Sequence, residues 1–123
     1  MAKKKDWKVI EKELEGIIVT TIDDVPGKQI TEYRGYVWGT SVQSKFFGHD
    51  ILAVLRGLIG GEITQYTVMI NDAKHEVIQR IVANARALGA DAVVGVRMGS
   101  GQVSPGMIEI FAYGTAVKLK KKK

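Results

Sequence analysis

Four stretches of the chain are rich in β-branched and aromatic residues and are bounded by turn residues, which is the pattern of β-strands. These stretches span residues 17–22, 30–42, 92–98 and 107–119. Pro26 and Gly27 follow the first stretch and suit the two central positions of a type II turn. Gly35 and Gly39 interrupt the second stretch, so we expect a bulge or a sharp bend there. The glycine-rich segment 99–106 predicts a turn between the last two strands.

Two apolar stretches between the second and third strands predict helices, and the longer one repeats its apolar residues every three or four positions, which is the period of a helix that faces a core. The longer one spans about 64–88, and Gly89 can end it in a left-handed conformation. Asn71 and Asp72 lie on its polar side, or alternatively start a second helix. The other stretch is a short apolar helix that begins near Asp50 and ends at a Gly-Gly pair. This order predicts an α+β fold, with a small, mainly antiparallel sheet and one long and one short helix.

Several predicted strands are apolar on both faces. In the last strand, Phe111 and Tyr113 share one face, while Ile108, Ile110 and Ala112 share the other. An antiparallel sheet with one face in water normally alternates apolar and polar residues. Two helices cannot cover both faces of four strands, so we expect a second copy of the chain to cover the remaining apolar surface. A cavity for a small ligand is the alternative explanation.

The length of 123 residues fits one domain. We divide the chain into an N-terminal extension at 1–16, which has the spacing of a short helix, a domain at 17–119, and a lysine tail at 120–123. The absence of cysteine excludes disulfides, thiolate metal ligands and a cysteine nucleophile. No signal peptide is recognisable and no apolar run approaches the ~20 residues of a membrane span, so we expect a cytoplasmic protein without membrane contacts.

The net charge of +5 arises outside the predicted domain. Residues 17–118 carry nine basic and nine acidic side chains, whereas 1–16 has an excess of one positive charge and 120–123 has four. Lysine runs at chain ends are usually solvated tails. We therefore do not expect nucleic acid among the partners.

Five segments occur in the order that is typical of the YbjQ-like family. They read IIVTTIDDVPGKQI, GYVWG, HDILAVLRGLIGGEITQYT, ARALGADAVVGVR and YGTAVKL. Together they extend over 17–119, so the chain resembles this family of small proteins, which carry a heavy-metal-binding label while their activity is unsettled. The resemblance implies a pentameric ring around a five-fold axis, in which additional strands aid assembly. A ring agrees with strands that are apolar on both faces.

Metal binding depends on few candidate ligands in this chain. Asp72, His75 and Glu76 have the spacing to meet on one helical turn, where they could hold a divalent ion such as Zn²⁺ or Ni²⁺. His49 is the other imidazole, and copies of a histidine can converge near the axis of a ring. The competing interpretation, which we prefer, is a solvated polar helix face, because soft metals favour thiolates and the chain has none.

The other candidate positions are polar residues near strand ends or helix starts. They are Thr20, Thr21, Asp23, Asp50 and Tyr66. The first three, with Asp24, form a polar cluster after the first strand, where turn chemistry is the competing explanation. His49 and Asp50 form a possible acid and base pair, although Asp50 equally serves as a helix cap. We identify no catalytic residue, because no nucleophile elbow, P-loop or zinc-protease motif occurs.

The glycines of 86–101 do not predict a phosphate site, because such a site needs glycines between a strand and a following helix. Gly95 falls inside the third strand, where close backbone packing is expected. We therefore predict a homo-oligomer, expected to be a pentamer, that acts as an assembly module or binds a small ligand or ion. One alternative is a metal-binding or metal-sensing oligomer that uses His and carboxylate ligands. The other is a small enzyme with a site between subunits.

Overall fold

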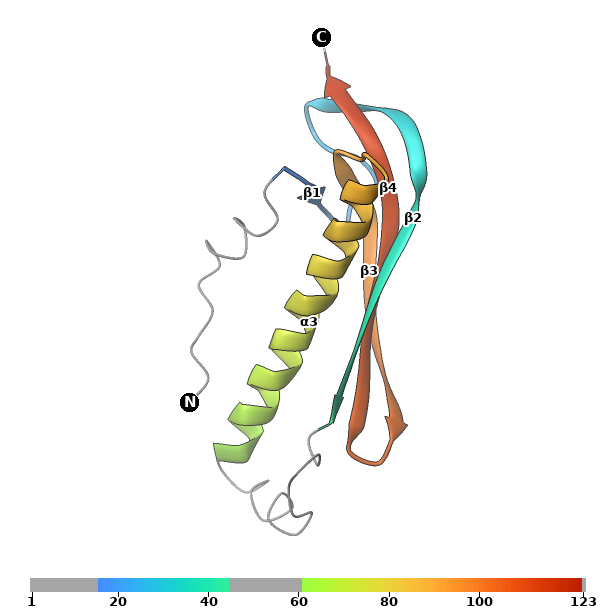
Figure 1. The fold of residues 1–123 in the computed structure, drawn as a ribbon. Coiled ribbons are helices and arrows are strands. Elements are labelled where there is room, and N and C mark those ends of the chain that lie inside the picture. Colours follow the sequence, from blue (N-terminus) through green and yellow to red (C-terminus); the bar gives the residue numbers. More distant parts are fainter. Residues whose placement is uncertain (1–15, 45–60, 123) are drawn as a thin grey trace.

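The computed structural model describes residues 16–44 and 61–122, which form two layers (Figure 1). A four-stranded sheet has the strand order β1-β3-β4-β2, and one long helix lies against it. The elements are β1 (Ile18–Val19), β2 (Lys28–Ser44), α3 (Gly61–Ala87), β3 (Ala92–Ser104) and β4 (Met107–Lys121). The short helices expected near Asp50 and within 1–16 lie outside the described residues. In the described part, no helix is long and apolar enough to cross a membrane.

The sheet is mixed. β4 lies between β3 and β2 and is antiparallel to both, as expected, but β1 is parallel to β3. The helix α3 continues through Asn71 and Asp72 without interruption, so the alternative of two helices is wrong. β1 is shorter than predicted because β3 bulges at Gly95, which has a φ of +63°. Backbone hydrogen bonds still link the segment after β1 to this bulge, and in one of them the Gly95 amide donates to the Ile22 carbonyl at 2.9 Å.

The turn between the first two strands forms as the sequence predicts. The Lys28 amide donates to the Val25 carbonyl at 3.0 Å, and Gly27 has a φ of +78°. These are the features of a type II turn with Pro26 and Gly27 at its centre.

The expected turn over 99–106 is wrong. β3 continues to Ser104, and the chain reverses at Pro105 and Gly106. Gly99 pairs with Phe111 of β4, and a Cβ on Gly99 would lie 2.5 Å from the Phe111 ring. This glycine therefore provides room for an aromatic ring on the neighbouring strand.

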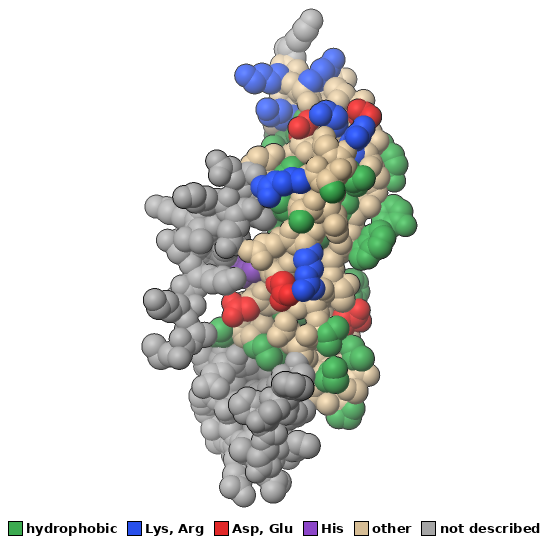
Figure 2. Space-filling view, viewed as in Figure 1, with side chains coloured by type: hydrophobic (Ala, Val, Ile, Leu, Met, Phe, Trp, Pro, Cys, Tyr) green, Lys and Arg blue, Asp and Glu red, His purple; other side chains and the backbone are tan. Residues whose placement is uncertain are grey.

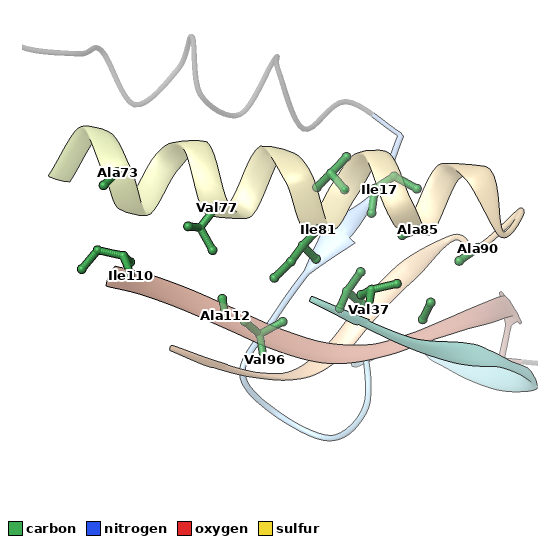
Figure 3. Packing of buried hydrophobic residues seen from close by; sticks show 13 residues of the cluster. Ile17, Val37, Ala73, Val77, Ile81, Ala85, Ala90, Val96, Ile110 and Ala112 are labelled. Carbon is green, nitrogen blue, oxygen red and sulfur yellow. The ribbon is translucent and has the colours of Figure 1, made fainter. Parts of the chain in front are cut away.

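The core lies between α3 and the sheet (Figure 3). Val77, Ile81 and Ala85 of α3 are fully buried, as their spacing predicts, and they face Val37 of β2 and Ala112 of β4. α3 approaches β2 so closely that a Cβ on Gly39 would lie 2.7 Å from the Val77 carbonyl oxygen. Gly39 is therefore a contact point between the layers. The register irregularities of β2 lie earlier, between Ile30 and Gly35.

The C-terminal lysines belong partly to the sheet. Lys120 pairs with Gln29 and Lys121 pairs with Lys28, so β4 crosses the boundary that we placed after residue 119. The Lys122 amide also donates to the Gly27 carbonyl at 3.2 Å. Residues 120–122 are therefore held against β2, where a solvated tail was expected.

Candidate functional site

The face of the sheet opposite α3, called here the outer face, carries a group of exposed aromatic side chains. Tyr36 and Trp38 alternate with core residues along β2 and are 67% and 57% exposed. Across the β2–β4 ladder, Trp38 pairs with Tyr113 of β4, which is 50% exposed. Phe111 lies two residues before Tyr113 and is half-buried. We call Tyr36, Trp38, Phe111 and Tyr113 the aromatic patch.

The aromatic patch has a fixed local geometry. The Tyr36 and Trp38 rings are stacked, with centroids 5.3 Å apart and planes inclined at 26°. The Phe111 ring lies over Gly99 of β3, so the patch extends across three strands. Figure 2 shows hydrophobic side chains at the surface on the side where Figure 1 places β2. A stacked aromatic surface of this kind has little side-chain entropy to lose when a partner covers it.

Another part of the outer face is covered by the chain itself. Val25, from the turn before β2, and Leu119 pack against Ala92, Val94 and Val117. The turn therefore accounts for some of the strand residues that are apolar on both faces. Among the described residues, the aromatic patch and the neighbouring Tyr33 and Val42 of β2 remain exposed on this face.

The free edge of β2 is engaged by polar side chains of α3. The Arg80 guanidinium donates to the Thr40 carbonyl, and Asn84 Nδ2 donates to the Trp38 carbonyl at 3.0 Å. Arg34 of β2 in turn donates from Nε to the Leu88 carbonyl at 2.7 Å. Open edges commonly recruit strands of other molecules, and here α3 supplies donors to two edge carbonyls. The outer face is therefore more available to a partner than this stretch of the β2 edge.

The polar cluster after β1 makes structural contacts. Thr20 Oγ1 accepts a hydrogen bond from the Ile22 amide at 3.3 Å, and the Thr21 carbonyl accepts one from Arg97 Nη1 at 2.8 Å. A carboxylate oxygen of Asp23 lies beside Gly95, 3.6 Å from where a Cβ would stand. These contacts attach the turn to β3.

The surroundings of the candidate metal ligands on α3 differ from those of a metal site. Glu76 accepts a hydrogen bond from the buried Ser41 hydroxyl at 3.1 Å and forms an ion pair with Arg80. Asp72 is exposed and His75 is half-buried on the same helix. Among the described residues, no group of three or more His, Asp or Glu side chains is placed to hold a metal ion. The donors of this part of the chain therefore do not fit a heavy-metal centre.

Three further candidates are not described. His49 and Asp50 lie outside the described residues, and Tyr66 lies in α3 with its side chain outside the described part. Conversely, the aromatic patch was missed as a site by the sequence interpretation. Its signal is the period-two placement of Tyr36 and Trp38, which puts both rings on one face.

Comparison with known proteins gives a consistent result. A family model described as "putative heavy-metal-binding" matches residues 17–120. A UPF0145 protein of Psychromonas ingrahamii is 50% identical over 105 residues, which are 85% of this chain and 100% of that protein. A UPF0145 protein of Archaeoglobus fulgidus is 47% identical over 104 residues, which are 85% of this chain and 96% of that protein.

A solved structure supports the same assignment at the level of fold. It is a DUF74-family protein of unknown function from Pediococcus pentosaceus, which matches with a TM-score of 0.56 and 18% sequence identity. The match covers 86% of this chain and 100% of that chain. Because the family model extends over most of the sequence and the relatives share about half of their residues with it, the chain belongs to the YbjQ-like family.

Proposed function

We propose that the chain is a subunit of a homo-oligomeric ring of five copies, which buries the aromatic patch and acts as an assembly or small-ligand or ion-binding module. The observation that carries the proposal is the exposure of Tyr36, Trp38 and Tyr113 on the same face of the sheet, where the Tyr36 and Trp38 rings are stacked. The number five follows from the family resemblance. The patch itself supports association and does not define how many copies take part.

The size of the aromatic patch favours association. Aromatic side chains bury about 150–250 Å² each, so exposures of 67%, 57% and 50% leave roughly 350 Å² in three rings. A stable interface takes about 800 Å² from each partner, so these rings would supply nearly half of it. At about 25 cal/mol per Å², covering them contributes ~9 kcal/mol as an upper bound, which is comparable to the cost of association. Contacts around the patch must therefore add to the aromatic contribution.

The experiment is size-exclusion chromatography with light scattering at micromolar concentration. Five copies of the 13.5 kDa chain give a mass of about 68 kDa, and a monomeric protein refutes the proposal. Trp38→Glu should dissociate the oligomer, because it places a carboxylate in the centre of the buried patch. Gln102→Glu is the matched control, since Gln102 is also an exposed strand residue but lies outside the patch. Circular dichroism of both variants tests whether the subunit still folds.

A further inference from the structure

Five lysines lie at the end of the sheet where β2 begins and β4 ends, away from the aromatic patch. We call Lys28, Lys118, Lys120, Lys121 and Lys122 the lysine end. Lys28 and Lys121 are directly opposite each other in the β2–β4 ladder, and the Lys122 amide is bonded to the Gly27 carbonyl. Figure 2 shows Lys and Arg side chains gathered at the end of the molecule where Figure 1 places the C-terminus. The fold therefore concentrates charge that a flexible tail would disperse.

Neighbouring carboxylates offset only part of the charge of the lysine end. Like charges directly opposite each other in a sheet are destabilising. Glu32 is paired with Lys118 in the ladder, but its carboxylate binds Arg34 at 2.7 Å. An Asp91 carboxylate oxygen accepts a hydrogen bond from the Leu119 amide at 2.9 Å. Within the described residues, no ion pair joins any lysine of this group to a carboxylate.

An exposed aromatic ring follows the lysine end on the same strand. Tyr33 of β2 is 65% exposed and pairs in register with Val117, which belongs to the outer-face cluster. Proteins that bind single-stranded nucleic acid combine basic side chains along the phosphates with aromatic rings on which bases stack. We propose that the lysine end and Tyr33 bind single-stranded nucleic acid, with phosphates on the lysines and a base on the Tyr33 ring.

The alternative partner, an anionic membrane, fits the same end less well. Stable membrane binding usually combines a basic cluster with apolar groups that enter the bilayer. Leu119 lies between the lysines but packs against Ala92, Val94 and Val117, so it is not free to insert. Ile30, which pairs with Leu119, is only 37% exposed, so a membrane would be held mainly by charge. The lysines lie away from the aromatic patch, whereas Tyr33 is the outer-face residue of β2 next to Tyr36, so the proposal requires the Tyr33 ring to stay accessible in the oligomer.

The test measures binding of the full chain to a short fluorescent oligothymidylate by anisotropy at several salt concentrations. Because Lys118 Nζ donates to the Gly89 carbonyl at 3.4 Å, the other four lysines supply the phosphate contacts. Four contacts give a slope of log K against log salt of about −2.8, and Lys120→Gln with Lys121→Gln should reduce its magnitude by about 1.4. Lys74→Gln, at an exposed position of α3, is the control and should leave the slope unchanged. Tyr33→Leu should weaken binding about 5- to 150-fold without changing the slope.

Two results would overturn the proposal. One is an affinity and slope that do not respond to the lysine substitutions. The other is binding that does not respond to Tyr33→Leu and is equalled by inorganic polyphosphate or by phosphatidylserine vesicles, since charge alone would then account for it. Thermal unfolding distinguishes loss of the site from loss of the fold. The double lysine variant should melt at the same or a higher temperature, because it removes repulsion between like charges.

Discussion

The contact between Gly39 and α3 gives a quantitative test of how the two layers pack. In Gly39→Ala, the new Cβ would lie 2.7 Å from the Val77 carbonyl oxygen and 3.0 Å from Arg80 Cβ. Neither atom is the end of a flexible side chain, so α3 has to move away from β2. Overpacking of this kind costs about 1–3 kcal/mol, while replacing glycine stabilises by about 0.4–1 kcal/mol through the unfolded chain. We therefore expect a net loss of about 1–2 kcal/mol in the free energy of unfolding.

Gly101→Ala is the matched control, because Gly101 is also a strand glycine and nothing lies within 4 Å of its added Cβ. This variant should gain about 0.4–1 kcal/mol, so the two variants should differ by ~2 kcal/mol. The assay is urea unfolding followed by circular dichroism, with all chains at one concentration because association shifts apparent stability. Equal unfolding midpoints for the two variants would refute the close packing of α3 on Gly39.

Three further predictions concern the core, the bulge and the candidate metal ligands. Ile81→Ala empties a fully buried position and should lower the free energy of unfolding by about 2–5 kcal/mol in the same urea assay; a loss below ~1 kcal/mol would contradict its place in the core. Gly95→Ala forces a side chain into a φ of +63° and should cost about 1–2 kcal/mol, whereas unchanged stability would argue against the bulge. In zinc titrations by calorimetry, His75→Ala should bind like the parent chain, because the neighbouring Glu76 is engaged by Ser41 and Arg80; weaker binding by this variant would identify His75 as a ligand.

The sequence predicted those parts of the fold that depend on local residue order. Pro26 and Gly27 define a turn whose geometry needs no distant partner, and the apolar period of 64–88 is a property of one helix. The sequence interpretation failed where a residue far away in the sequence determines the conformation. Gly99 resembles a turn residue in isolation, but the Phe111 ring of the next strand occupies the space that a side chain would take.

The same distinction applies to the candidate site. Helical spacing correctly places Asp72, His75 and Glu76 on one helix, but it cannot reveal that Ser41, 35 residues away in sequence, binds the Glu76 carboxylate. The lysine run was interpreted as a solvated tail because lysine runs at chain ends usually are, and its partner strand lies far away in the sequence, near the start of the domain. Only the pairing of Lys121 with Lys28 shows that two distant basic segments share one end of the sheet.

The aromatic patch also places a condition on the proposed ring. A contact in which the patch of one subunit meets the patch of its neighbour is isologous and closes with two copies. A ring of five instead requires the patch to meet a different surface of the next subunit. Light scattering separates these arrangements, because two copies have a mass of about 27 kDa and five have about 68 kDa. A Trp38-sensitive dimer would retain the patch as an interface and refute the ring, whereas a Trp38-sensitive pentamer would require a second, complementary surface on every subunit.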